Sequence, residues 1–283
     1  MTMILENEYL SVKINPVGAE LCSIYGKEEK CEYLWQADPK VWERHAPILF
    51  PAVGRVAGDS YIYGGKRYRM GKHGFARDMK FEEVAKSRTS LVLRLRSDNA
   101  TKEIFPFDFE FDVYFSLCGK TLTEKYTVRN LGAEKMYFSI GAHPGFFCKH
   151  GDFIRFEKPE TLKAQYLDGS DTVGNPDDFI MLDGKDKITL TKELFERGSL
   201  ALEAPRSTYA ELCTPCGKPY LRESYGNIPM LWLWAKAGEE YICIEPWHGS
   251  DERHVEEVLE KKKGIVELDY AKTFEFPIEI TIM

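Results

Sequence analysis

The 283-residue sequence lacks long hydrophobic runs, an export signal and an excess of basic residues. Its apolar stretches, such as residues 230–235, have the length of one buried strand and are too short to span a bilayer. Residues 1–10 have neither the basic nor the apolar region of a signal peptide, which predicts a cytoplasmic protein. The net charge of −7 disfavours contact with phosphate backbones and anionic lipids, so we expect neither nucleic-acid nor membrane binding.

Motifs that identify several common enzyme classes are also missing. The chain has no Gly-x-Ser-x-Gly elbow of a serine hydrolase, no dinucleotide fingerprint and no phosphate-binding glycine loop, so we expect no cofactor. The seven cysteines are scattered and odd in number, which is typical of reduced thiols. Cys213 and Cys216 form a single CxxC, which we interpret as a structural turn. A metal or redox site is the alternative, but a zinc site needs a second pair of ligands nearby.

What the sequence does contain is short apolar runs with period-two alternation, and 13% aromatic residues, both typical of strands. Gly64 and Gly65 predict the two-residue turn of a hairpin over residues 61–70, and residues 130–133 predict a second hairpin between 122–129 and 135–140. The other expected strands cover residues 10–14, 19–25, 90–96 and 107–117.

Helix signals are few. Residues 250–252 can cap a short helix over 253–262, and residues 191–197 predict a turn or two. The segment 168–187 is rich in glycine and aspartate, which predicts loop and turns. With no repeat or linker in view, we expect one all-β domain over residues 1–283, built as a sandwich or barrel of antiparallel sheets.

Four clusters place polar groups inside apolar or glycine-rich stretches, and these are the candidates for chemistry. His73 follows the first hairpin, His143 follows a strand, and Glu245 is predicted to end a buried strand. Imidazole exchanges protons near neutral pH, and a buried carboxylate can act as a base. Each residue alone is more often structural, and the three together could also bind a metal, but their spacing does not indicate a metal site. The four clusters are residues 42–55, 72–78, 139–147 and 241–249.

These clusters resemble the aldose 1-epimerase (galactose mutarotase) superfamily, and within it the LacX-like subgroup. The resemblance runs nearly end to end and rests on four motifs together. They are Ala-Pro-Ile-Leu-Phe-Pro at 46–51, His-Gly-Phe-Ala-Arg at 73–77, Gly-Ala-His-Pro at 141–144 and Ile-Glu-Pro-Trp at 244–247.

The resemblance implies a galactose mutarotase-like β-supersandwich of antiparallel sheets with few short helices and a sugar in a cleft. It makes Glu245 the general base that takes the proton of the C1 hydroxyl. His143 is then the general acid that protonates the ring oxygen, and His73 helps to hold or polarise that oxygen. The family also holds sugar hydroxyls with an aspartate, whose position within 167–194 the sequence does not reveal.

Further residues are assigned to substrate binding by the same resemblance. Arg44 and Arg77 resemble arginines that contact phosphate in hexose-6-phosphate epimerases, with a salt bridge to Asp78 or another acid as the alternative. Arg55 stands in the family's Gly-Arg, but the Asn-Arg pair that typically follows is absent. Trp247 is expected to stack on the sugar; Trp35 and Trp42 are expected to pack in the core.

Three functions remain open from the sequence. The first is an isomerase that interconverts the α and β anomers of a hexose, and the second is a hexose-6-phosphate 1-epimerase. The third is a non-catalytic carbohydrate-binding or sensor protein on the same fold. In each case the expected partner is a small-molecule sugar. The sequence predicts no metal and does not indicate the oligomeric state.

Overall fold

The computed structural model describes residues 2–167, 177–250 and 258–283, and strands dominate these segments. A four-stranded antiparallel sheet is formed by β1 (Met3–Glu6), β2 (Leu10–Asn15), β3 (Glu20–Gly26) and β4 (Cys31–Glu32). The strands expected over 10–14 and 19–25 are thus confirmed as β2 and β3.

The second sheet has fifteen strands and is antiparallel throughout. It follows one long path, with β14 (Gly145–Phe147) added to β21 and β16 (Phe179–Thr189) added to β15. The strands along the path are β5 (Ile48–Leu49), β13 (Ile140–Ala142), β21 (Tyr241–His248), β20 (Met230–Trp234), β17 (Ser199–Glu203), β15 (Phe153–Leu167), β18 (Tyr209–Cys213), β19 (Pro219–Ser224), β23 (Thr273–Ile282), β11 (Thr121–Asn130), β10 (Phe109–Cys118), β9 (Ser90–Arg96) and β8 (Glu82–Lys86).

Two strand pairs and a few short helices complete the described fold. The pair β6 (Ser60–Tyr63) and β7 (Lys66–Arg69) confirms the first hairpin, since Gly64 and Gly65 both take the positive φ angles of such a turn. The other pair joins β12 (Met136–Phe138) to β22 (Val266–Leu268). The helices are α1 (Asn99–Ile104) and the 3₁₀ turns η1 (Ala57–Asp59), η2 (Ala76–Asp78) and η3 (Leu259–Lys261).

The second predicted hairpin is wrong. β11 pairs with β10 and β23, whereas β12 leaves that sheet and pairs with β22. Asn130 explains the turn: its side chain accepts a hydrogen bond from Gly132 N and donates to the carbonyls of Glu134 and Leu268. These bonds fix the turn and direct the chain toward β22 instead of back along β11.

The loop predicted over 168–187 is wrong in its second half. Residues 168–176 lie outside the described residues, but β16 begins at Phe179 and pairs with β15 along most of its length. Its mainly exposed side chains gave no alternation signal, and the strand forms because backbone pairing to β15 satisfies its polar groups. Similarly, only 258–262 of the helix expected over 253–262 is described; there the chain forms η3.

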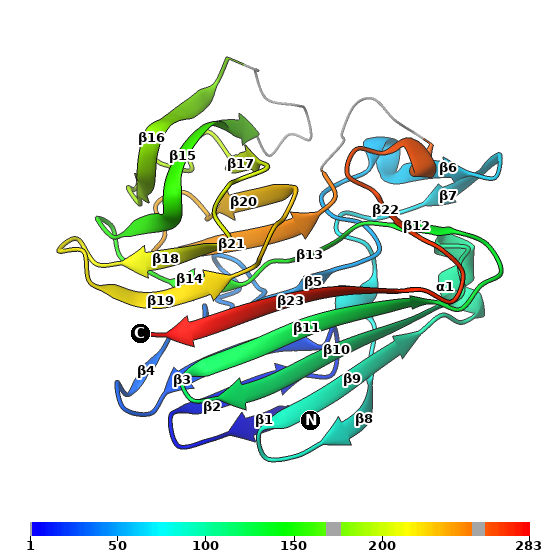
Figure 1. Cartoon of the computed structure of the whole chain (residues 1–283), viewed down its shortest axis with the longest axis horizontal. Coiled ribbons are helices and arrows are strands. Elements are labelled where there is room, and N and C mark those ends of the chain that lie inside the picture. The colour runs from blue at the N-terminus through cyan, green and yellow to red at the C-terminus, as the bar shows by residue number, and fades with distance from the viewer. Residues whose placement is uncertain (1, 168–176, 251–257) are drawn as a thin grey trace.

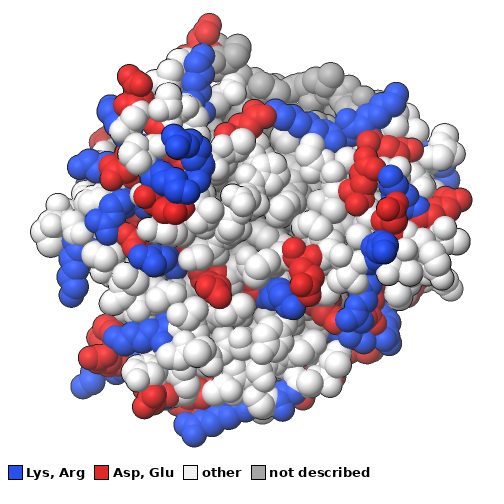
Figure 2. Space-filling model, in the orientation of Figure 1, with Lys and Arg blue, Asp and Glu red and all other residues white. Residues whose placement is uncertain are grey.

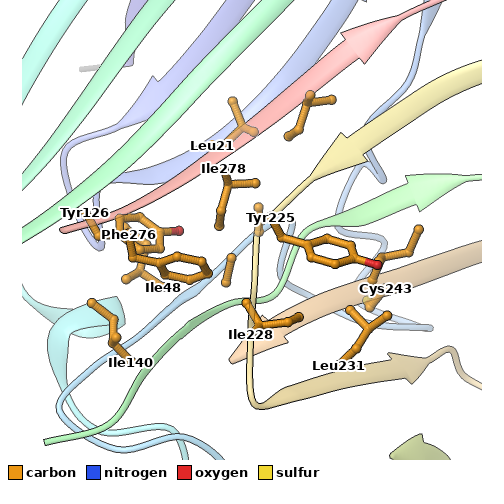
Figure 3. Close-up of a cluster of buried hydrophobic side chains, with 14 of the residues drawn as sticks. Leu21, Ile48, Tyr126, Ile140, Tyr225, Ile228, Leu231, Cys243, Phe276 and Ile278 are labelled. Carbon is orange, nitrogen blue, oxygen red and sulfur yellow. The ribbon is translucent and has the colours of Figure 1, made fainter. Parts of the chain in front are cut away.

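The core lies between the four-stranded sheet and the β8–β11 part of the large sheet, which Figure 1 shows crossing one another. Leu91, Leu93 and Leu95 of β9 point into it, which confirms the predicted alternation. The core continues beneath β21, where Figure 3 shows Leu21 of one sheet and Leu231 of the other in a single buried cluster. The same packing fixes the strands that carry the candidate site.

The surface shown in Figure 2 mixes charges of both signs around a largely uncharged centre. Basic side chains on this face alternate with acidic ones and form no broad patch among the described residues. No helix within the described segments is both long enough and apolar enough to cross a bilayer.

Candidate active site

A pocket of about 340 Å³ opens where β13, β20 and β21 lie side by side. This volume falls in the range of small-molecule binding sites. The pocket brings together all three predicted acid–base residues and several aromatic and basic side chains. Its walls are formed by Trp42, Arg44, Pro47, Lys72, His73, Arg77, His143, Leu167, Gly198, Ser199, Trp232, Trp234, Glu245 and Trp247.

Glu245 and His143 form the floor of the pocket. Glu245 lies within β21 opposite Trp232 of β20 and is only 2% exposed. The prediction that Glu245 ends its strand is wrong, because β21 continues through Pro246 to His248. His143 directly follows β13, and its Nε2 lies 3.2 Å from Glu245 Oε1. Two neighbouring strands therefore hold an imidazole and a carboxylate within reach of a proton transfer.

Burial disfavours the charged form of both groups. It raises the pKa of Glu245 well above its usual value, an effect that the positive charge of Lys72 partly opposes. Burial also lowers the pKa of His143, and the charges of Lys72 and Arg77 lower it further. A raised pKa makes the Glu245 carboxylate a stronger base, and a lowered pKa makes protonated His143 a stronger acid.

His73 reaches the same pocket from a tight turn, where its own φ is +65°. Gly54 N donates to His73 Nδ1 over 3.0 Å, so the neutral ring carries its proton on Nε2. The next residue, Gly74, has φ of +71°, and a Cβ there would overlap the Phe50 carbonyl. The backbone thus orients His73 as a hydrogen-bond donor, with its ring 5.6 Å from that of His143.

Indole rings line much of the pocket wall. Trp42 stacks on His143 at a centroid distance of 5.0 Å, and Trp247 stacks on Trp232 at 4.7 Å. Gly141 makes room for Trp247, because a Cβ at this position would overlap the indole. Flat apolar walls with a few polar anchors are typical of pockets that bind small ligands.

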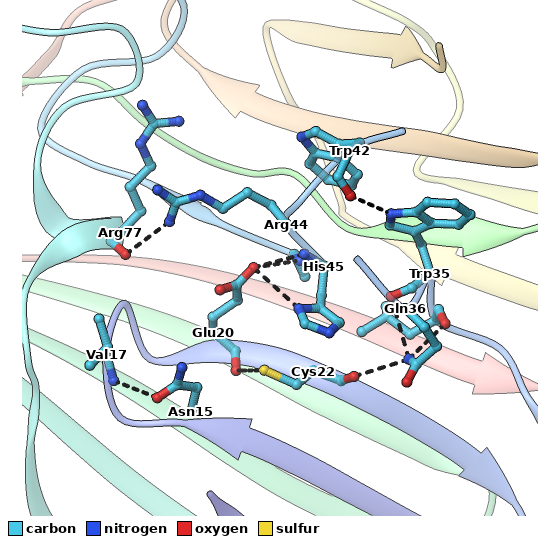
Figure 4. Close-up of polar contacts among 12 residues, drawn as sticks. Asn15, Val17, Glu20, Cys22, Trp35, Gln36, Trp42, Arg44, His45 and Arg77 are labelled. Atoms are coloured by element: carbon cyan, nitrogen blue, oxygen red, sulfur yellow. Dashed lines mark hydrogen bonds and ion pairs between the residues drawn. The ribbon is translucent and has the colours of Figure 1, made fainter. Parts of the chain in front are cut away.

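Three basic side chains, Lys72, Arg44 and Arg77, line the pocket. Arg44 donates to the Arg77 carbonyl over 3.3 Å and pairs with Asp78 over 2.6 Å, as Figure 4 shows for the contact with Arg77. Burial and the charge of Arg44 lower the pKa of Arg77. Arg44 therefore forms the predicted salt bridge to Asp78 and also lines the pocket.

Comparisons with known proteins agree with this geometry. A model of the aldose 1-epimerase family matches residues 1–179. Two forms of Protein LacX from Lactococcus lactis subsp. lactis, chromosomal and plasmid, are 30% and 29% identical to this chain over 299 residues. Each alignment spans 100% of both proteins. The chain belongs to the aldose 1-epimerase family.

Solved structures of this family's fold extend the likeness to three dimensions. A galactose mutarotase related enzyme from Lactobacillus acidophilus superimposes with a TM-score of 0.93 at 31% identity, covering 100% of this chain and 97% of that one. A galactose mutarotase-like protein from Lactobacillus casei gives a TM-score of 0.91 at 27% identity and covers 100% of both chains. The expected galactose mutarotase-like β-sandwich is thus confirmed.

The structure does not bring Arg55 into the pocket of this epimerase-family chain. Arg55 lies instead against a second, smaller cavity, with its Nε 3.8 Å from Asp59 Oδ1. This aspartate ends the 3₁₀ turn η1, which follows Arg55 closely in the sequence. We therefore omit Arg55 from the candidate site, whereas Arg44, Arg77 and Trp247 remain in it.

Sequence reasoning missed three aromatic residues of the site. Trp42 was expected in the core, but it covers His143. Trp232 and Trp234 line the pocket as alternate residues of β20. The one sequence signal that could have identified Trp232 and Trp234 is their spacing of two residues, which places both side chains on the same face of a strand. The expected core position of Trp35 agrees with its stacking on Tyr241.

Two groups of side chains among the described residues could hold a metal ion. In one, ligand atoms of His143, Cys243 and Glu245 lie within 4.8 Å of one another; the other consists of Glu20, Cys22 and His45. An ion bound by the first group would be coordinated by His143 and Glu245, the two members of the acid–base pair.

The CxxC at Cys213 and Cys216 belongs to neither group. Cys213 ends β18 and is buried, while Cys216 is exposed in the turn that leads to β19. The turn is closed by Gly217 N donating to the Thr214 carbonyl. This arrangement agrees with the interpretation of the motif as a structural turn.

Proposed function

We propose that this protein is an aldose 1-epimerase that interconverts the α and β anomers of a hexose. The observation that carries the proposal is the 3.2 Å contact between His143 Nε2 and Glu245 Oε1 on the floor of a sugar-sized pocket. Anomer exchange needs one group that removes a proton from the C1 hydroxyl and another that protonates the ring oxygen. Both groups must work in either direction, which suits an imidazole and a carboxylate.

The reaction starts from the ionised pair, in which Glu245 is a carboxylate and His143 an imidazolium. Burial makes this the less populated state of the pair, because it favours the neutral form of each group. Glu245 takes the proton of the C1 hydroxyl, the C1–O5 bond breaks with its electron pair moving to O5, and His143 protonates O5. The open-chain aldehyde then rotates about C1–C2, and the reverse steps close the ring on its other face. No proton is gained or lost overall.

The burial of the pair favours ring opening. Before the transfer both groups are charged, and after it both are neutral. Because burial disfavours the charged form of each, it drives the proton from His143 to the sugar and from the sugar to Glu245. The donor Nε2 of His73 can hold the ring oxygen or a neighbouring hydroxyl during these steps.

A second candidate substrate is a hexose 6-phosphate. The observation that favours it is the presence of three basic residues, Arg44, Arg77 and Lys72, in the lining of the pocket. Burial and, after it, the positive charge of Arg44 lower the pKa of Arg77, and a phosphate dianion would offset the repulsion between the two guanidinium groups. Among the described lining residues only Glu245 is acidic, and its burial favours the neutral form.

NMR exchange spectroscopy on free hexoses and their 6-phosphates tests both proposals. We expect the wild-type protein to accelerate anomer exchange of at least one sugar over the spontaneous rate in the same buffer. Faster exchange of the phosphates than of the free sugars would identify the second candidate as the substrate. Faster exchange of free sugars would leave the arginines as structural partners of Asp78.

A non-catalytic sugar-binding protein would give a different result. It would bind a sugar in the same titration without changing the rate of anomer exchange, and that outcome would overturn the proposed activity. A pure binder needs hydroxyl contacts, but it does not need a matched acid and base in contact on a buried floor. This difference is why the rate, and not binding alone, decides between the two.

A further inference from the structure

Outside the pocket, Glu20, Cys22 and His45 meet at the edge of the four-stranded sheet, as Figure 4 shows. Glu20 and Cys22 lie on β3, and a β-bulge separates their neighbours: Lys13 of β2 pairs with Ser23, but Ile14 pairs with Leu21. Cys22 is therefore the extra residue of the bulge. Bulges change the direction of a side chain relative to a regular strand.

His45 approaches this bulge from a loop far away in the sequence. Its backbone N–H donates to Glu20 Oε1 over 2.8 Å, and its ring Nδ1 lies 3.8 Å from the same oxygen. The Cys22 thiol donates to the Glu20 main-chain carbonyl over 3.2 Å. One sulfur, one nitrogen and one carboxylate oxygen thus lie within 4.8 Å of one another.

This donor set matches the ligands that zinc takes in proteins. Zinc binds thiolate at about 2.3 Å and imidazole or carboxylate at about 2.0–2.2 Å, which places tetrahedral ligands roughly 3.3–3.7 Å apart. The nitrogen–oxygen distance of 3.8 Å already approaches that spacing. The Cys22 sulfur lies within 4.8 Å of both other ligand atoms, so it needs to move by at most about 1 Å, which a side-chain rotation can supply. Three protein ligands leave the fourth position for water.

The charges at this site also suit a dication. The Cys22 thiol carries a proton that it donates to the Glu20 main-chain carbonyl. A bound dication would replace this proton, which leaves to solvent, and would offset the charge of Glu20.

We propose that Glu20, Cys22 and His45 bind a zinc-like divalent cation that fastens the loop after Trp42 to the bulge of β3. His45 directly follows Arg44, whose guanidinium lines the pocket. The ion would thus hold the backbone that presents Arg44 without touching the acid–base pair. The proposal concerns a site separate from the catalytic floor, and it stands or falls independently of the proposed epimerase activity.

Titration of the reduced full-length protein with Co²⁺ tests this site, since thiolate-bound Co²⁺ absorbs in the near ultraviolet. We expect a saturable band at one Co²⁺ per chain in the wild type, and competition by Zn²⁺. Cys22→Ser and His45→Gln should each weaken binding at least about 10-fold, because each removes a ligand. Cys118→Ser, which removes an exposed thiol elsewhere, should leave the titration unchanged.

The variants Cys22→Ser and Cys243→Ser can show that the proposal is wrong. If Co²⁺ binds Cys22→Ser within two- to threefold of the wild-type affinity, or if the wild type shows no band, the proposal is wrong. If Cys243→Ser abolishes the band while Cys22→Ser retains it, the ion lies in the pocket group and the proposal is also wrong. Circular dichroism of each variant shows that the fold is intact, and no sugar or activity measurement is needed.

Discussion

Glu245 and Glu223 are both buried glutamates, and burial raises the pKa of both, yet only Glu245 lines a pocket. Glu245 lies against an imidazole at 3.2 Å. Glu223, on β19, is completely buried, and neither of its carboxylate oxygens has a hydrogen-bond partner in the described part of the chain. Both carboxyl groups are buried, but Glu245 contacts a side chain with which it can exchange a proton, whereas Glu223 does not among the residues that the structure describes.

This comparison shows that a perturbed carboxylate is not by itself a functional site. After burial, the charges of Glu124 and of Glu245 itself raise the pKa of Glu223, and Glu124 is a second buried carboxylate that accepts a hydrogen bond from Tyr126. Glu223 on β19 and Glu124 on β11 are both buried, and neither lines the candidate pocket. A functional role also requires a partner for proton transfer and a pocket that a ligand can enter, and Glu245 has both.

The largest effect is expected from removing either member of the acid–base pair. Glu245→Gln and His143→Ala should each lower the rate of anomer exchange by on the order of 10²-fold or more, since a positioned acid or base contributes about 10²–10⁴-fold. Polarimetry or NMR exchange measures the rate. Glu223→Gln is the matched control: it should leave the rate nearly unchanged, because it replaces one neutral buried group by another.

Glu223→Gln should instead change stability. The folded-state pKa of Glu223 lies above its unfolded value of 4.5, so the folded state binds more protons and loses stability as pH rises above that value. Removing the carboxyl should therefore raise the free energy of unfolding by at most about 3 kcal/mol at pH 7. The gain should disappear near pH 4. Urea unfolding at both pH values measures it, and an equal gain at both would contradict the assigned cause.

A smaller effect on kinetics is expected from Arg77, one of the basic residues that line the pocket. If the substrate is phosphorylated, Arg77→Gln should raise KM about 10-fold for a hexose 6-phosphate and leave kcat within a factor of about two, since it removes one charge-assisted contact. Arg206→Gln, at an exposed arginine that does not line the pocket, is the matched control. An equal change in KM for free sugars would argue against a phosphate contact.

The smallest effect is expected at Trp42, which stacks on His143. Trp42→Leu should lower the exchange rate about 3- to 10-fold, because an aromatic pair contributes roughly 0.5–1.5 kcal/mol beyond its buried area. Trp42→Phe keeps a ring over the imidazole and should lose less. Steady-state kinetics of the two variants separates the stack from simple burial; identical losses would show that the ring contact has no part in orienting His143.

Local patterns in the sequence predicted the elements that depend on local physics. The alternation of residues 90–96 was sufficient to predict the buried face of one strand. The Gly64-Gly65 pair was sufficient to predict a turn, because it depends on the backbone conformation of these two residues alone. The four polar clusters likewise predicted that His73, His143 and Glu245 belong together, and the pocket does contain all three. Their catalytic roles stay a proposal.

The remaining features depend on long-range pairing that no local pattern encodes. β16 forms because β15 offers a partner, although its own residues resemble a loop. The turn at Asn130 sends the chain to β22, more than a hundred residues away in sequence. Trp232 and Trp234 share a strand face, but only the assembled sheet decides that this face meets the pocket. Arg55 misses the pocket for the same reason.

The distribution of tryptophan has a practical consequence. Four of the five tryptophans line the pocket, namely Trp42, Trp232, Trp234 and Trp247. Intrinsic fluorescence of this protein is therefore largely an optical signal from its candidate sugar site. A ligand that displaces water from the indole rings should change the emission, and it can be titrated without a label or turnover. Occupancy can thus be followed even in variants that have lost the acid or the base.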